Sequence, residues 1–325
     1  MKTYKILLTS IGGITQMPDS QKIFGALVYM FSDEYGTEKA NKFVKDILDK
    51  KIFLALSNLL PNDYLPTPVD YLVDKLHNTD NNEKLDIKKV RKDIKKRHYL
   101  QKDNLNKILK NPLCNKELYP YVKIVERQQL RASIESVKLD TAALDSNLYS
   151  VPYITPVKID TVNSPGSVIT EFNFFLQIDD SVECSEFFKM IINAVNLKQN
   201  IILGKRASQG LNIFQLNKII DYNIINNSEN MFLNTGMLLP DNINFVKSTL
   251  QLFTSERRPY EISGGWNSDF ERRYISFIKE GSVISIPNNC RDAVKSIESP
   301  FDSKSIVFGN AFLYPMPEVG GVKND

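Results

Sequence analysis

The chain has 325 residues, of which 42% are hydrophobic and 24% are charged, as in a globular protein with a substantial core. This composition excludes a disordered, collagen-like or coiled-coil protein as a description of the whole chain. The net charge is only +3, but residues 83–110 hold 11 basic and 4 acidic residues, a local charge of +7. Such a block suits either a polyanion-binding surface or a solvated helix face.

Cysteine and histidine limit the chemistry. Cys114, Cys184 and Cys290 are far apart and form no Cys-x-x-Cys pair, so we expect no disulfide framework and a reducing, cytoplasmic location. His77 and His98 are the only histidines, which excludes a His-rich metal site. The first residues do not resemble a signal peptide, and no run of about 18 apolar residues predicts a membrane span.

The first elements follow from hydrophobic periodicity. A strand is expected over 4–10, and a helix begins at Asp19 or Ser20, either of which can cap it. The remaining expected elements of this region are a helix over 37–48, a strand over 53–57 and a short helix over 69–76.

The basic block follows a polar linker over 77–83. Residues 85–109 are rich in Lys, with a thin apolar stripe at Ile87, Val90, Ile94 and Ile108. We expect a helical insertion on the surface and not a core element. Extended structure resumes over 122–125, and the weak periodicity of 127–150 is typical of a functional or disordered segment.

The second half begins with an alternating segment, which predicts a half-buried strand over 168–178. Its inner face would hold Val168, Phe172, Phe174, Leu176 and Ile178. A helix over 182–197 follows, capped by Asp179 or Ser181, and its inner face would hold Phe187, Phe188, Ile191, Ile192 and Val195. Strands are expected over 201–203 and 211–222, and short strands and turns over 232–315. Strand–helix openings at 4–31 and 168–197 are compatible with two copies of one fold.

A glycine-containing loop between two of these strands is the strongest local signal. Gly204 and Gly210 bracket Lys205, Arg206, Ser208 and Gln209. Glycines let a backbone approach an anion, and cationic and polar side chains hold phosphate. The loop matches neither a Walker loop nor a dinucleotide-binding loop, and an ordinary turn with exposed charges remains the alternative.

Two further segments suit nucleic acid. Residues 127–135, rich in Arg and Gln, could contact phosphates and bases from a projecting hairpin, or form a solvated strand pair. Trp266, after Gly264 and Gly265, could stack on a base or anchor a core. The adjacent carboxylates Asp179 and Asp180 diverge in a turn and indicate no acid–base site.

Four stretches in this order resemble one known family, subunit four of the type III-A CRISPR Csm complex, in the Cas-five-like group of the RAMP superfamily. Residues 20–27 resemble its Ser-Asp-Thr-Ile-Phe-Gly-Ala-Leu pattern, and residues 53–68 its FxLS…P…YLPxP pattern. Residues 204–214 resemble its GxxRSxGxGxF loop. The fourth stretch combines residues 264–266, 280–283 and 308–312.

Two departures from the family pattern stand out. Asn212 replaces the last glycine of the loop, which would leave the loop less open. Ile134 is followed by Glu135 and Ser136, so the usual hairpin arginine is missing, and Arg131 or Lys138 would replace it.

The resemblance implies an α+β fold of two packed ferredoxin-like (RRM-like) RAMP domains. The first would cover 1–160, with a helical insertion at about 78–118 and a projecting thumb hairpin at about 126–150. The second would cover 161–325 and carry the glycine-rich loop at 204–210.

The resemblance also implies a non-catalytic role without cofactor or metal. The family holds the 5′ repeat-derived tag of the CRISPR RNA and joins the large Cas-ten subunit to the Csm-three backbone subunit, with its thumb near the target RNA. Three groups of residues would bind RNA: the loop Gly204, Lys205, Arg206, Ser208, Gln209 and Gly210; a second cradle of Gly12, Gly13, Gln16 and Ser20; and the thumb residues Arg127, Gln128, Arg131, Ser133, Ile134 and Lys138.

Two other functions remain open. A metal-independent CRISPR RNA-processing endoribonuclease can use the same fold with His, Tyr or Lys as acid and base, although neither histidine lies in the loop before the first helix. The other is a structural adaptor with negligible RNA contact.

Overall fold

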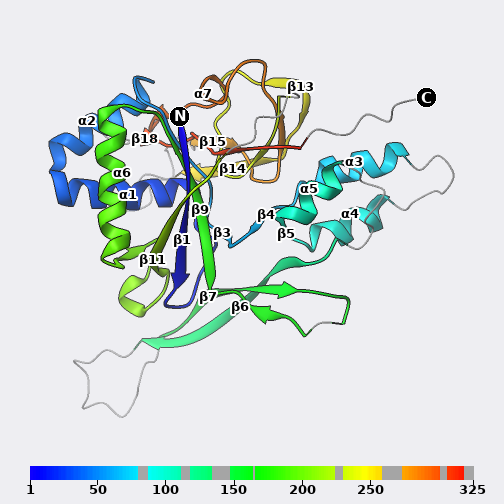
Figure 1. Ribbon diagram of the computed structural model, residues 1–325. Helices are drawn as coiled ribbons and strands as arrows, with labels where there is room; N and C mark the ends of the chain where they lie inside the picture. The colour runs from blue at the N-terminus through cyan, green and yellow to red at the C-terminus, as the bar shows by residue number, and fades with distance from the viewer. Residues whose placement is uncertain are drawn as a thin grey trace, which may run out of the picture.

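The structure is a computed structural model of the chain (Figure 1). It describes residues 1–79, 87–110, 118–133, 147–163, 165–223, 230–257, 273–300 and 306–317. These residues form a mixed α+β protein built on antiparallel sheets, as the sequence predicted at that level. Within these ranges, no helix combines the length and apolar character that crossing a membrane requires.

The central sheet has the strand order β10-β11-β1-β9-β2, and β3 also pairs with β9. Its strands are β1 (Lys2–Ser10), β2 (Leu54–Leu56), β3 (Leu60–Pro61), β9 (Glu171–Ile178), β10 (Asn200–Ile202) and β11 (Ile213–Asp221). Three helices cover one face (Figure 1): α1 (Ser20–Tyr35), α2 (Thr37–Leu48) and α6 (Val182–Asn196). The strands and helices expected for this part of the chain are confirmed, with ends displaced by a few residues.

Side-chain caps explain where two of these helices begin. The Asp19 carboxylate accepts a hydrogen bond from the N–H of Lys22 at 2.9 Å, so Asp19 and not Ser20 caps α1. Ser181 caps α6 by accepting from the N–H of Cys184 at 3.3 Å. Asp179 supports this cap, because it accepts from both the N–H and the hydroxyl of Ser181.

The alternation of β9 predicted burial of one face only. In the structure both faces of β9 are buried. The expected inner residues pack under the helices: Phe172, Phe174, Leu176 and Ile178. On the opposite face Phe175 stacks on Phe312 in a second core, with ring centroids 4.9 Å apart, and Asn173 is 1% exposed. Elements distant in sequence cover this second face, so the local pattern could not reveal its burial.

Two apolar residues expected inside are exposed. Val168 lies in the edge strand β8 (Ser167–Val168), separate from β9, and is 63% exposed. Ile192 lies at the side of α6, whose inner face holds Phe187, Met190, Ile191 and Ala194.

The basic insertion is not one surface helix. It comprises α4 (Ile87–Lys95), β5 (Tyr99–Gln101) and α5 (Lys102–Lys110), and it follows α3 (Val69–Thr79), the helix expected over 69–76. Strand β5 pairs with β4 (Tyr64–Pro66) and with β6, so apolar residues that look sparse along one helix converge from separate elements. Six of them are buried in the second core, which makes the insertion part of a core: Ile94, Tyr99, Leu100, Leu105, Ile108 and Leu109.

The described ends of the segment of weak periodicity lie in two long antiparallel strands that project from the molecule (Figure 1). These strands are β6 (Tyr121–Ser133) and β7 (Asn147–Ile159), paired from Tyr121↔Ile159 to Ser133↔Asn147. Together with β4, β5 and β8 they form a five-stranded sheet. We call β6 and β7 the thumb hairpin.

The remainder of the chain consists mainly of short strands, as predicted. A four-stranded sheet has the order β13-β16-β12-β19, with β12 (Met231–Asn234), β13 (Asn244–Thr249), β16 (Val283–Ser285) and β19 (Leu313–Pro315). The other elements are β14 (Leu252–Arg257), β15 (Arg273–Ile278), β17 (Ile297–Glu298), β18 (Ile306–Val307) and the short helix α7 (Cys290–Ala293).

The two main sheets share one strand order. If β1, β2, β9 and β11 are numbered first to fourth, their order across the central sheet is fourth, first, third, second. The four-stranded sheet has the same order when β12, β13, β16 and β19 are numbered in the same way. Between β8, at the edge of the five-stranded sheet, and β9, the chain returns to the central sheet, where β9 and β11 both pair with β1. It passes from the central sheet to the four-stranded sheet between β11 and β12, after residue 221.

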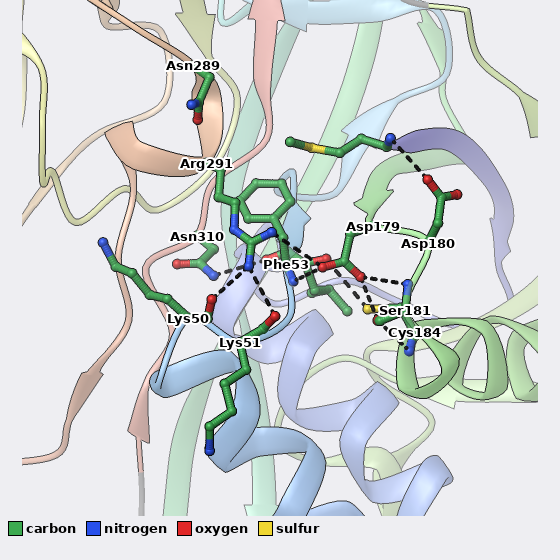
Figure 2. Close-up of polar contacts among 12 residues, drawn as sticks. Lys50, Lys51, Phe53, Asp179, Asp180, Ser181, Cys184, Asn289, Arg291 and Asn310 are labelled. Atoms are coloured by element: carbon green, nitrogen blue, oxygen red, sulfur yellow. Dashed lines mark hydrogen bonds and ion pairs between the residues drawn. The ribbon is translucent and has the colours of Figure 1, made fainter.

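A cluster of hydrogen bonds and an ion pair connects the central sheet to α7 (Figure 2). Arg291 donates to the carbonyl oxygens of Lys50 and Lys51 at 2.7 and 3.1 Å, and its guanidinium lies 3.7 Å from the Asp179 carboxylate. Asp179 also accepts from the N–H of Phe53 at 2.7 Å. The cluster therefore joins the segment after α2, the end of β9 and the C-terminal part of the chain.

Candidate nucleic-acid interface

The loop after β1 and the loop between β10 and β11 lie side by side. Gly13 forms a parallel bridge with Leu211, and the N–H of Asn212 donates to the Gly13 carbonyl at 2.8 Å. The next residue, Ile14, accepts from the N–H of Ile154 in the thumb hairpin at 2.8 Å. The two loops expected to cradle RNA therefore meet at the base of the hairpin.

Asn212 holds these loops together. Its Oδ1 accepts from the N–H of Thr15 at 2.9 Å, and its Nδ2 donates to the carbonyl of Lys205 at 2.8 Å. The side chain is almost wholly buried and the backbone is left-handed, with φ +58°, a conformation that Asn adopts more readily than most residues. The residue that replaces the family's glycine thus supplies the contacts that shape the loop.

Close packing explains two of the glycines. A Cβ atom on Gly12 would lie 1.9 Å from the carbonyl oxygen of Gly210, and one on Gly13 would lie 2.2 Å from the Tyr153 ring. Gly210 differs, because a Cβ there would meet nothing within 4 Å, but its φ of +75° favours glycine. Gly12 and Gly13 therefore allow the two loops and the hairpin to touch.

The thumb hairpin contacts the glycine loop through side chains. Arg131 donates from Nη1 to Oε1 of Gln209 at 2.8 Å. The guanidinium of Arg206 lies over the ring of Tyr149, 5.6 Å from its centroid, a distance suited to a cation–π contact. These contacts bring together residues separated by more than fifty positions in sequence.

A groove of about 560 Å³ lies between the hairpin and the loop after β1. Gln16 lines one side, and Arg127 and Gln128 line the other. All three side chains are exposed, so polar atoms of both expected RNA-binding segments face a common space.

Positive charge is not offset within the glycine loop. Residues 203–213 contain no acidic residue, and Lys205 and Arg206 are exposed. Ser208 and Gln209 are also exposed beside them. Exposed guanidinium and ammonium groups with neighbouring amides and hydroxyls suit a phosphate backbone.

Not every expected site residue lies on this surface. Ser20 is fully buried; its hydroxyl accepts from the N–H of Met237 at 3.0 Å, and its N–H donates to Asn58. Its predicted RNA contact is therefore a misassignment of a residue that positions α1. Ile134, Lys138 and the segment 264–266 lie outside the described residues, and Ser133 is described only as the last residue of β6.

Of the two histidines, only His98 has a described side chain. His98 accepts at Nδ1 from the N–H of Ile124 at 3.2 Å, and burial together with the charge of Lys279 lowers its pKa. The side chain of His77 is not among those described. No group of three or more His, Cys, Asp and Glu side chains placed to hold a metal occurs in the described ranges.

Sequence reasoning missed the residues that assemble the interface. Thr15, Tyr149 and Tyr153 each contact a partner far away in the chain, and no local pattern marks them. The sequence did mark Asn212, because it departs from the glycine of the family's loop. Nothing in the sequence marked the groups to which Asn212 bonds.

No family model and no curated protein sequence matches the chain, whereas solved structures do. A chain of the Csm3–Csm4 subcomplex of the type III-A CRISPR-Cas interference complex is 16% identical, with a TM-score of 0.60 over 98% of this chain and 100% of that chain. A chain of the Csm1–Csm4 cassette in complex with cA4 is 15% identical, with a TM-score of 0.55 over 97% and 99%. A chain of the same cassette in complex with pppApA is 15% identical, with a TM-score of 0.53 over 98% of this chain and 100% of that chain.

Csm4 is the subunit that these complexes have in common. The chain therefore has the fold of Csm4, a subunit of type III-A CRISPR-Cas complexes, over nearly its whole length. The resemblance that the sequence motifs indicated is confirmed at the level of the fold.

Proposed function

We propose that this protein is a non-catalytic RNA-binding subunit of a type III-A CRISPR (Csm) effector complex, and that it holds the 5′ repeat-derived tag of the guide RNA. One observation carries the proposal. The glycine loop, the loop after β1 and the thumb hairpin converge on one surface with exposed Lys205, Arg206 and Arg127. Such a surface can follow a phosphate backbone without base-specific contacts.

Partners follow from the structures that share the fold. Because those complexes contain Csm4 beside Csm1 or Csm3, we propose that this chain joins a large Cas-ten subunit to a Csm-three backbone subunit in the cytoplasm. The thumb hairpin would lie near the target RNA.

The shared strand order supports two ferredoxin-like units. The order fourth-first-third-second of both sheets is that of a βαββαβ unit. The first unit would then comprise β1 to β11, with the insertion and thumb hairpin between β3 and β9, and the second β12 to β19. The glycine loop belongs to the first unit in this division.

The endoribonuclease alternative lacks support at this surface. The bond from the Ile124 N–H to His98 Nδ1 uses the lone pair that a general base would need, and a lowered pKa disfavours the charged form. Incubation of the purified protein with repeat RNA in EDTA decides the question, because specific cleavage would exclude a binding-only role.

The main test is binding of fluorescently labelled 5′-tag RNA to the full-length chain over a range of salt concentrations. Replacing Lys205 and Arg206 with Ala should weaken binding and reduce the slope of log K against log salt by about 0.7 for each lost phosphate contact. Lys189, an exposed lysine of α6, provides the control K189A, with unchanged binding. Wild-type affinity in the loop variant would refute tag binding and favour a structural adaptor.

A further inference from the structure

One face of β6 carries the charge of the thumb hairpin. Side chains alternate along a strand, so Tyr121, Lys123, Arg127 and Arg131 share a face. The opposite face belongs to the core at its base, where Val122 is fully buried and Ile124 packs against both main cores. The odd-numbered residues remain at least partly exposed from Tyr121 to Arg131.

The cations on this face are not neutralised. Lys123, Arg127 and Arg131 form no ion pair with any residue in the described ranges, and between Tyr121 and Arg131 the only acid, Glu126, is on the other face. From Lys123 to Arg131 the strand rises by about 26 Å at about 3.3 Å per residue. Three cations over that length, without an ion-pair partner among the described residues, can contact several successive nucleotides of an extended strand.

One end of this face is a cluster of Arg97, from the basic insertion, with the rings of Tyr119 and Tyr121. The guanidinium of Arg97 lies 5.1 Å from the centroid of the Tyr121 ring and 5.5 Å from that of Tyr119. The two tyrosine rings are 5.2 Å apart and tilted by 50° to one another. Arginine planes and tyrosine rings are the groups on which single-stranded bases stack.

The other end reaches the glycine loop. Arg131 bonds to Gln209, and its neighbour across the hairpin, Tyr149, lies under Arg206. The face is therefore continuous from the insertion, along β6, to the loop proposed to hold the tag.

We propose that the odd-numbered face of β6 is a track for single-stranded RNA, running from the Arg97–Tyr119–Tyr121 cluster to the glycine loop. The inference rests on the proposed RNA-binding function and extends it from the thumb residues already assigned to Lys123 and to this cluster. It also gives the basic insertion a role, since Lys96 and Arg97 lie beside Tyr121 at the start of the track.

RNA is the occupant that this chemistry fits. Spaced cations without acids complement a regular polyanion, and the tyrosine rings complement bases. An acidic protein surface would need the cations but not the rings, so the pair of rings distinguishes the two partners.

The test compares two RNAs on the full-length chain: a short one of about 8 nucleotides and a long one of about 24, which can also cover the track. Lys123→Gln should weaken long-RNA binding about 3- to 10-fold, lower its salt slope by about 0.7 and leave short-RNA binding unchanged. Arg97→Gln should also weaken binding of the long RNA and leave binding of the short RNA unchanged. The matched control is Lys158→Gln, on the opposite face of the same hairpin, where Lys158 already pairs with Asp160.

The outcomes are separable. Equal long-RNA affinity of the wild type and Lys123→Gln, or an equal loss in Lys158→Gln, overturns the track while the tag site stands. If Lys123→Gln instead lowers only co-purification with another Csm subunit, the face is a protein interface. If the variant with Ala at Lys205 and Arg206 binds both the short and the long RNA with wild-type affinity, the tag-binding proposal itself fails. Thermal unfolding of each variant confirms that it is folded.

Discussion

Arg131 on the thumb hairpin donates from Nη1 to Gln209 in the glycine loop at 2.8 Å, and from Nε and Nη2 to Gln129 at 3.2 and 3.0 Å. A chain of side-chain bonds thus runs from the hairpin to the loop. All are near the surface, where such bonds add little to stability. The contact between Arg131 and Gln209 therefore orients the hairpin against the glycine loop but contributes little to its stability.

Changing the charge of Gln209 tests whether RNA lies at this contact. Gln209→Glu should keep the contact with Arg131 as an ion pair and yet lower tag-RNA affinity about 3- to 10-fold, because the carboxylate repels phosphate. Fluorescence anisotropy at low salt measures this. The neutral Gln209→Ala should lose less affinity, and equal affinities of the two variants would contradict the prediction.

Removing the Asn212 side chain should damage both stability and binding. Asn212→Ala leaves the partly buried N–H of Thr15 and the carbonyl of Lys205 without their partner and puts Ala at a positive φ. A loss of about 2–4 kcal/mol in the free energy of unfolding is expected, together with weaker tag binding. Urea denaturation measures the first and anisotropy the second.

Asn212→Gly is the matched control, since glycine accepts the backbone angle but supplies no hydrogen bonds. It should be less destabilised than Asn212→Ala by about 1 kcal/mol. Equal stability of the two variants would show that backbone strain is irrelevant here.

Two glycine substitutions should have opposite effects. Gly12→Ala forces a Cβ to 1.9 Å from the Gly210 carbonyl, so the two loops must separate. We expect a loss of more than about 2 kcal/mol in stability. Gly25 lies within α1 with nothing within 4 Å of its Cβ position, so Gly25→Ala should stabilise by about 0.5–1 kcal/mol. Thermal or urea unfolding tests both, and destabilisation by Gly25→Ala would contradict the packing described.

The Asp179 cluster predicts a pH-dependent stability. Burial raises the pKa of Asp179, but hydrogen bonds from Ser181 and Phe53 outweigh burial and lower it overall. A lowered folded-state pKa gives stability that is present above the unfolded value of about 3.9 and lost as the pH falls through the folded value. Asp179→Asn should therefore cost about 1–2 kcal/mol at neutral pH, and the difference from wild type should shrink below about pH 4.

The neighbouring Asp180 is the control. Its side chain is 68% exposed and pairs only with the N-terminus and Lys2 among the described residues. Asp180→Asn should change stability by less than about 0.5 kcal/mol. Denaturant titrations at two pH values compare the variants, and a pH-independent loss in Asp179→Asn would argue against an ionised carboxylate in the cluster.

Local patterns predicted local structure well and non-local structure poorly. Helix α2 was predicted residue for residue, because its amphipathic period lies within the helix itself. The insertion was misjudged because its core depends on β5 pairing with strands on either side in sequence. Burial of both faces of β9 was missed for the same reason.

The interface shows the same division. Lys205, Arg206 and Arg127, chosen for their charge and their place in the loop and hairpin, are exposed as a binding role requires. Ser20 was misassigned because its hydroxyl partner, Met237, lies 217 residues further on. Thr15 and Tyr149 were missed because their partners belong to other loops.

The pairing of β1 with β9 governs how the chain reaches this fold during its synthesis. The apolar side chains of β1 and α1 leave the ribosome long before β9, which follows β1 by about 160 residues and so by roughly 8–32 s at about 5–20 residues per second. During that interval the first strand and helix lack the neighbour that completes their sheet. The intervening insertion and hairpin pair with each other and can fold first, so the nascent N-terminal strand is the segment that most needs protection from aggregation.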